Sequence, residues 1–92
     1  MRLIAVLPEG QSKLTDKFRR ASMSIALNIA EAAGKTSPAE AAHHFAIARG
    51  LARECGAILD VLRLIGTESN DALGKGDELL VRIVSMLTRL CR

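Results

Sequence analysis

The sequence is poor in aromatic residues: it has no tryptophan or tyrosine, and its only phenylalanines are Phe18 and Phe45. A core built from this chain must therefore be aliphatic. Base stacking on aromatic platforms is excluded in practice, because both phenylalanines fall in apolar helical patterns. Proline is equally scarce, with Pro8 and Pro38 alone. Such a composition favours helices packed against helices.

The sequence also lacks a long apolar run and a cysteine framework. No stretch approaches the roughly 20 apolar residues that a membrane span requires, and the opening MRLIAVLPEG is too short for a signal peptide. Cys55 and Cys91 both lie among apolar residues at helical spacing. This setting is typical of free, structural thiols in a reducing compartment. We expect a cytoplasmic protein with no membrane association.

Recognisable catalytic motifs are missing too. No Ser or Cys is spaced with His and an acid, and no Gly-rich loop joins a strand to a helix. Glu40 and His43 have the Glu-x-x-His spacing of di-iron bundles, but that site needs a second motif and two further glutamates. The other histidine, His44, lies about 100° round the helix. We predict that the protein is not an enzyme and holds no metal or cofactor.

What the sequence does contain is three helical patterns in a single domain, residues 1–92. The predicted helices span 11–34, 38–65 and 70–91, and residues 1–9 form an N-terminal stub that Pro8 interrupts. In the sequence TSPAE, Ser37 is the expected N-cap and Pro38 the first helical residue of the second helix.

Glycines mark the ends and the weak points of these patterns. Gly34 and Gly66 are the expected stops of the first and second helices. Gly74 and Gly76 each cost about 1 kcal/mol relative to alanine inside a helix. The first turns of the third helix are therefore its weakest part.

Apolar residues at steps of three and four define the face that each helix buries. In the first helix these residues are Leu14, Phe18, Ala21, Ile25, Ile29 and Ala32. The second helix has a seam through Ala41, Phe45, Ala48, Ala52, Cys55, Leu59 and Leu62, and a stripe through Ile47, Leu51, Ile58, Val61 and Ile65. The third pattern uses Leu73, Leu80, Ile83, Leu87 and Leu90. Two adjacent stripes on the second helix predict two neighbouring helices.

One amide, Asn28, interrupts the apolar stretch RRASMSIALNIAEAAGK. On a helical wheel it lies about 40° from the centre of the buried face. A buried amide without partners costs about 1–3 kcal/mol, so Asn28 should bond to Ser24, to Glu31 or to a facing backbone group. We predict that Asn28 and Glu31 are structural polar residues. A ligand-binding role for Asn28 is the alternative.

The opposite side of the same segment is also apolar. It presents Met23, Ala26, Leu27 and Ala30, which would form an exposed apolar patch on an isolated helix. We predict that these four residues lie in an oligomer interface.

Positive charge follows one flank of the first helix, in a chain whose net charge is +3. Lys13, Lys17 and Arg20 share this flank, and Arg19 stands beside them. They form either an ordinary solvated face or a ridge that contacts phosphates.

The segments RRASMSIALNIAEAAGK and AEAAHHFAIARGLARECGAILDVLRLIG resemble the four-helix bundle family that includes the proteins encoded in intervening sequences of bacterial 23S ribosomal RNA. The matching residues are Arg19, Arg20, Ala21, Ser24, Ile25, Asn28, Ile29, Ala30, Glu31, Phe45, Ala48, Arg49 and Gly50. Ala26 and Leu27 replace a usual Pro-Ser or Pro-x pair, and Ala32 replaces a glycine. The resemblance covers Pro8 to Gly66, and the third helix only by its pattern.

This resemblance implies an all-α, up-and-down bundle of the four-helix family, here with three long helices and a truncated N-terminal helix. The family is similar to the accessory proteins of diversity-generating retroelements, basic bundles that form pentameric rings and bind nucleic acid and a reverse transcriptase. A homo-oligomer, a pentamer by resemblance, is thus expected, with RNA or DNA and a protein as partners. Two functions stay open: a nucleic-acid-binding accessory factor, or a structural adaptor with no nucleic-acid role.

Overall fold

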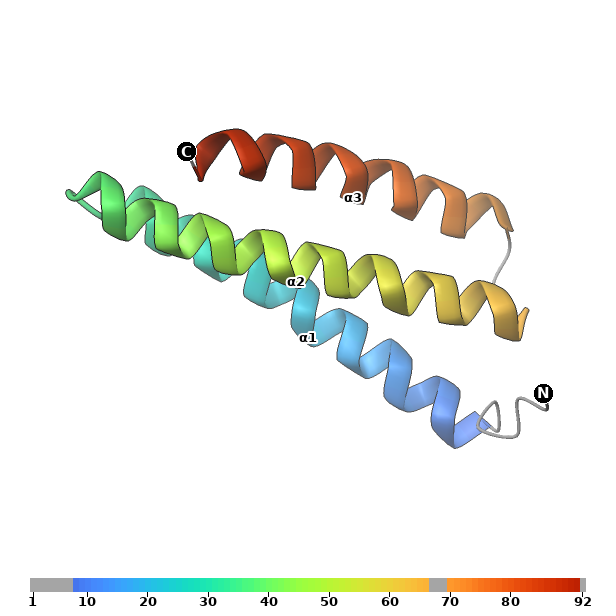
Figure 1. The fold of residues 1–92 in the computed structure, drawn as a ribbon. Helices are drawn as coiled ribbons and strands as arrows, with labels where there is room; N and C mark the ends of the chain where they lie inside the picture. The colour runs from blue at the N-terminus through green and yellow to red at the C-terminus, as the bar shows by residue number, and fades with distance from the viewer. Residues whose placement is uncertain (1–7, 67–69, 92) are drawn as a thin grey trace.

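The computed structural model describes residues 8–66 and 70–91, which form the three helices α1 (Pro8–Ala33), α2 (Pro38–Ile65) and α3 (Asn70–Leu90). The described residues contain no strand, so the predicted all-α class is confirmed. Successive helices run in opposite directions (Figure 1). Of the predicted N-terminal stub, residues 1–9, residues 8 and 9 belong to α1, and residues 1–7 lie outside the described residues.

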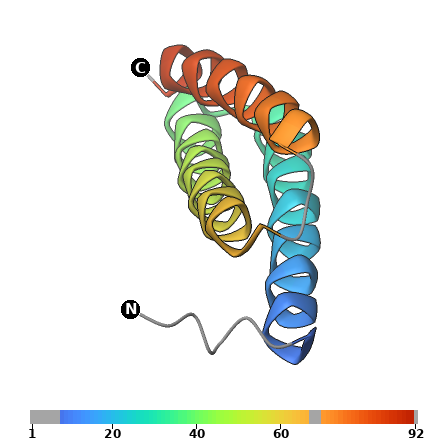
Figure 2. The ribbon, with the colours of Figure 1, turned by 90° about the vertical axis from the view of Figure 1, so that its right-hand side faces the viewer.

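Helix α2 is the centre of the structure because it packs along both other helices, whereas α1 and α3 contact each other far less. In Figure 2, α1 runs down the picture beside α2 and α3 crosses above both, so that the three helices together form a triangle. The two neighbours of α2 are those that its two apolar stripes predicted. One side of the triangle, between α1 and α3, is therefore the least closed.

The core is aliphatic, as the composition predicted, and consists of two clusters. The first contains Ala21, Ile25, Ala48, Ala52, Cys55 and Leu87, and the second contains Ile58, Leu59, Leu62 and Leu73. Phe18 packs against both clusters and so connects them. No polar or charged residue is fully buried in the part of the chain whose side chains are described.

Three residues predicted to be buried are instead exposed: Leu90, Ile47 and Val61. In α3 the contact with α2 follows Leu73, Leu80 and Leu87, and Leu90 lies about 60° round the helix from that line. Ile47 lies at the N-terminal end of the second stripe of α2, and Val61 lies at its side, about 60° round the helix from Ile58. A single helix crossing over that stripe covers its middle, at Ile58, and leaves its margin in solvent.

The start of α1 corrects one prediction. The helix begins at Pro8 rather than at residue 11, so Pro8-Glu9-Gly10 is its first turn and not a break. Proline is tolerated in the first turn because the amide hydrogen that it lacks would have no partner there. At the other end, the Gly34 N–H donates to the carbonyls of Ala30 and Glu31 at 3.2 and 3.1 Å.

The ends of α2 confirm the predicted signals. The Ser37 hydroxyl accepts the Glu40 amide hydrogen at 3.4 Å, and Pro38 follows as the first helical residue. Gly66 closes the helix with a φ of 73°, in the left-handed region that favours glycine. These two caps fix the length of α2, and hence the surface that it offers to α1 and α3.

Candidate nucleic-acid interface

The four cations of the α1 ridge, Lys13, Lys17, Arg19 and Arg20, are all exposed on α1. Two carboxylates offset part of their charge. Asp16 pairs with Arg19 at 3.5 Å and also with Arg20, and Lys17 reaches Glu54 of α2 at 3.7 Å. Lys13 has no ion-pair partner among the described residues. The ridge is thus a mixed surface with a net positive charge.

These ion pairs do not remove the cations from reach of a ligand. The side chains of Arg19 and Arg20 remain 68% and 79% exposed. Pairs this exposed contribute about 0–1 kcal/mol each and are screened by salt. A phosphate group can therefore compete with Asp16 for both guanidinium groups.

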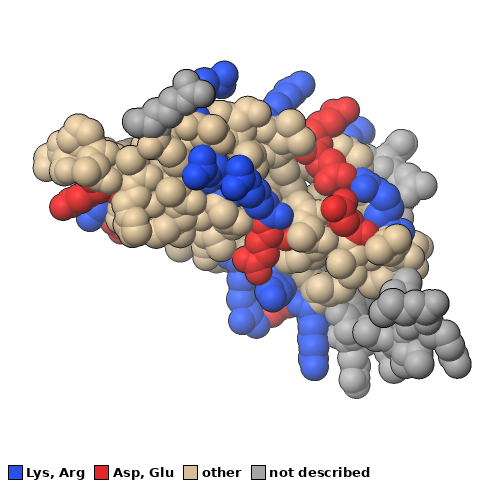
Figure 3. Space-filling model, viewed as in Figure 1, with Lys and Arg blue, Asp and Glu red and all other residues tan. Residues whose placement is uncertain are grey.

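A second basic site lies on α2 and was not predicted from the sequence. Arg49 and Arg53 lie one helical turn apart, and neither makes an ion pair within residues 8–66 and 70–91. Positive side chains over α2 and along α1 are visible on one face of the molecule (Figure 3). The available signal was the i, i+4 spacing of two arginines with no acid between them on that side.

Asn28 lies between α1 and α2 and uses both ends of its side chain. Its Nδ2 donates to the backbone carbonyl of Ser24 at 2.9 Å, and its Oδ1 lies 3.2 Å from Nδ1 of His44. Because Oδ1 is an acceptor, His44 must carry its proton on Nδ1. Ser24 was a predicted partner, whereas His44 was not. Glu31 instead forms an ion pair with Lys35 at 3.8 Å.

The predicted interface patch, Met23, Ala26, Leu27 and Ala30, is exposed on the outer side of α1. Met23 is 59% exposed and Leu27 is 63% exposed. The patch faces away from the core contacts of Ala21 and Ile25. Within the single chain, no described residue covers it.

A family model described as 23S rRNA-intervening sequence protein matches residues 2–89. The chain belongs to this family. The match extends through most of α3. The sequence motifs ended at Gly66, and only the apolar spacing of the third helix agreed with the family. No curated protein and no solved structure matches the chain. The family description names an intervening sequence of 23S rRNA and no reaction, ligand or assembly.

In this 23S rRNA-intervening sequence protein, the thiol of Cys55 lies in the core between the helices. Cys55 is fully buried and unpaired, and its Sγ lies 3.8 Å from the Ser22 hydroxyl. Burial raises the pKa of the Cys55 thiol above its ordinary value; the Ser22 hydrogen bond opposes this shift and the Glu54 charge adds to it. A protonated, buried thiol is a poor nucleophile.

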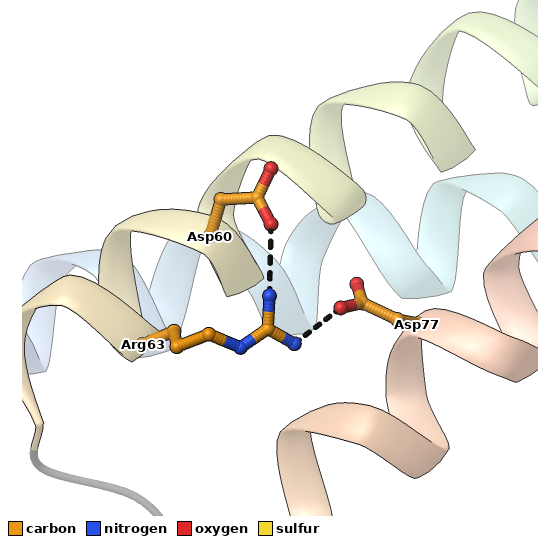
Figure 4. Close-up of polar contacts among 3 residues, drawn as sticks. All are labelled: Asp60, Arg63 and Asp77. Carbon is orange, nitrogen blue, oxygen red and sulfur yellow. Dashed lines mark hydrogen bonds and ion pairs between the residues drawn. The ribbon is translucent and has the colours of Figure 1, made fainter. Parts of the chain in front are cut away.

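Arg63 connects α2 to α3 at the end of the bundle where α2 finishes. It donates to Asp60 of its own helix at 3.3 Å and to Asp77 of α3 (Figure 4). The hydrogen bond and charge of Asp77, with a smaller contribution from Asp60, raise the pKa of Arg63. The Arg63–Asp77 ion pair links α2 to α3, and we call Asp60, Arg63 and Asp77 the Arg63 clamp.

The described residues form neither a metal-binding cluster nor a membrane-spanning helix. Within 8–66 and 70–91, no three or more His, Cys, Asp or Glu side chains gather in a way that could hold a metal ion. His43 and His44 contact each other edge to face, with ring centroids 5.7 Å apart. None of the helices described is both long and apolar enough to cross a membrane.

Proposed function

We propose that this member of the 23S rRNA-intervening sequence protein family is a non-enzymatic, homo-oligomeric helical bundle that binds RNA or DNA through phosphate contacts, as an accessory factor. The observation that supports this proposal is the position of exposed cations of α1 and α2 on one face (Figure 3). The binding surface consists of the α1 ridge together with Arg49 and Arg53.

Oligomerisation strengthens such a surface. A subunit with a net charge of +3 attracts nucleic acid weakly, but a ring of identical subunits repeats the basic face and holds several contacts at once. The resemblance to the accessory proteins of diversity-generating retroelements points to a pentamer. Assembly through Met23, Ala26, Leu27 and Ala30 would leave Lys13 and Lys17 accessible, because these two cations lie on the flank of α1. Arg19 lies one turn before Met23, at the end of the patch.

The expected binding is indifferent to base sequence and sensitive to salt. Exposed lysine and arginine side chains contact chiefly phosphates, which carry no base information, and the sequence has no tryptophan or tyrosine on which bases could stack. Each phosphate contact with duplex DNA adds about −0.9 to the slope of log affinity against log salt. A shallow slope would indicate few contacts per subunit.

Fluorescence anisotropy with a labelled single-stranded RNA and a labelled DNA duplex tests this surface. The variant K13E/K17E/R20E should abolish binding, and R49E/R53E should weaken it. K75E/R82E/R89E is the matched control, because it makes the same charge change on α3 and should leave RNA binding intact. Light scattering must show the same oligomer for all variants.

Equal loss of binding in the α3 control would show that net charge, rather than this face, is responsible. If the wild-type protein binds neither nucleic acid at low salt, the nucleic-acid role is wrong. The second candidate, a structural or adaptor assembly protein, would then stand. It is favoured by one observation: Asp16 and Glu54 already offset part of the charge of the α1 ridge.

A further inference from the structure

One side of α3 carries an apolar row that the three-helix core uses only in part. The row consists of Gly76, Leu79, Ile83, Met86 and Leu90, at alternating steps of three and four residues, and we call it the α3 seam. This is the a and d spacing of a coiled coil. Leu79 is 58% exposed, Met86 42% and Leu90 44%. The contact with α2 instead follows Leu73, Leu80 and Leu87, one position further round.

The first part of the α3 seam opens into an apolar groove between the helices. Thr15 and Phe18 of α1, Leu59 and Leu62 of α2, and Gly76 and Leu79 of α3 line a cavity of about 420 Å³. A Cβ atom on Gly76 would lie 3.0 Å from Leu59 Cδ1, so the absence of a side chain there lets α3 approach α2 closely. The groove lies on the least closed side of the bundle.

A column of cations borders the α3 seam. Lys75, Arg82 and Arg89 recur every seven residues and are exposed. No ion pair engages any of them within the described part of the chain. In coiled-coil terms they occupy the g position, immediately before each a position, and residues there select the partner helix by charge.

A second copy of α3 does not suit this surface. An antiparallel copy would bring its own g positions, and therefore its cations, opposite these cations. A parallel copy would bring its e positions, which are Leu73, Leu80 and Leu87. Those leucines pack in the core of their own chain. Neither arrangement supplies a negative charge.

We propose that the α3 seam and its groove bind an amphipathic helix of a different protein, with apolar residues at a and d spacing and Asp or Glu beside them. The acidic residues would pair with Lys75, Arg82 and Arg89, and the apolar residues would cover Leu79, Met86 and Leu90. This proposal does not depend on nucleic-acid binding, because its surface is α3 and not the basic face of α1 and α2.

Other ligands with negative charge fit the same surface less well. A nucleic acid would satisfy the cations but leave the apolar seam in water. An anionic bilayer would accept both features, yet a groove recessed between helices is suited to a rod-like helix rather than to a flat surface.

Two designed helical peptides test the proposal with the full chain. Both have Leu at a and d positions; one has Glu at the flanking positions and the other has Lys. Fluorescence anisotropy should show that the Glu peptide binds at least about tenfold more tightly, the effect of several exposed charge pairs together. In K75E/R82E/R89E this preference should invert. L79D should weaken the binding of both peptides.

Circular dichroism establishes that each variant is folded. If the triple variant does not fold, the single variant R82E should shift the preference between the Glu and Lys peptides in the same direction. Failure of the wild-type protein to bind the Glu peptide would overturn the proposal, as would equal binding of both peptides. Binding of RNA or phosphatidylserine vesicles that is lost in K75E/R82E/R89E but kept in K13E/K17E/R20E, without binding of the Glu peptide, would assign the surface to that ligand instead.

Discussion

The Asn28 side chain joins α1 to α2 through one hydrogen bond to its own helix and one to His44. A hydrogen bond of this kind contributes about 1 kcal/mol to the free energy of unfolding. Leaving its partner half-buried and without a hydrogen bond costs a similar amount. The two residues should therefore act as one unit. This makes the pair a better test of helix pairing than either residue alone.

We predict that N28A and H44A each lower the free energy of unfolding by about 1 kcal/mol. The double variant should lose less than their sum, with a coupling of at least about 0.5 kcal/mol. Urea unfolding of all four proteins in the cycle measures this coupling. S24A is the matched control, because Ser24 contributes only its backbone carbonyl. Full additivity would contradict a direct Asn28–His44 bond.

Two glycines in the first half of α3 give a second prediction. G74A should stabilise the protein by about 1 kcal/mol, because alanine is the better helix former and no atom lies within 4 Å of the added Cβ. G76A should give no such gain, because its Cβ would lie 3.0 Å from Leu59 Cδ1. Thermal unfolding compares the two, and equal stabilisation would contradict the close approach at Gly76.

Local rules predicted some residue contacts and missed others for a physical reason. The Ser24 partner of Asn28 was predictable because an i−4 neighbour is fixed by helix geometry. His44 was not, since sixteen positions separate it from Asn28 and only the rotation of α2 about its axis brings the two together. The Lys17–Glu54 pair depends on the same rotation. Charges on one helix can be assigned to a face, but not to a partner.

Among the helices, α2 and α3 are held at one end by the Arg63 clamp with Asp60 and Asp77. The clamp lies at the surface, and α3 makes few contacts with α1. Both outer helices therefore depend on α2, and the contact of α3 with α2 is the smaller of the two. Detachment of α3 is the local opening that we expect at lowest cost.

We predict that D77N lowers the thermal unfolding midpoint and speeds hydrogen exchange in α3 more than in α1. The charge that holds Arg63 across the interface is lost, so the effect should shrink at high salt. E78Q is the matched control, since Glu78 is exposed and makes no ion pair within the described ranges. Equal effects of D77N and E78Q would show that Asp77 does not hold α3.

Element boundaries followed from the sequence where capping chemistry is explicit. Ser37, Pro38 and Gly66 gave the limits of α2, because each satisfies or removes a backbone group that a helix end leaves without a partner. Pro8 was misread, since proline is compatible both with a break and with a first turn. The prediction that Leu90 is buried was wrong. Periodicity defines an apolar face about 100° wide, whereas α2 covers only a narrower line of α3 through Leu73 and Leu87.

For the whole molecule, the described surface divides into regions of different chemistry. Exposed cations lie on the α1 ridge and on α2, the α3 seam is apolar with a basic border, and the outer side of α1 is apolar around Met23 and Leu27. A chain of 92 residues has a small core and limited stability of its own. Both apolar surfaces therefore favour association, and their different borders make them suited to different partners.

We predict that the protein is a homo-oligomer at micromolar concentration, assembled through Met23, Ala26, Leu27 and Ala30. Burial of about 400 Å² of apolar surface per subunit would contribute on the order of 10 kcal/mol before association costs of similar size. A closed ring or dimer satisfies every copy of the patch, and the resemblance favours a pentamer. Sedimentation or light scattering measures the assembled mass.

The variant M23E/L27E should dissociate this oligomer, because four-residue spacing places both carboxylates on the patch and each would have to leave water. L64E is the matched control: Leu64 is 72% exposed on α2, away from the patch, so the oligomer should persist. The prediction would be wrong if the wild-type protein were a single folded species of 9.9 kDa that melts cooperatively. The patch on α1 would then remain in solvent and would not mediate oligomerisation.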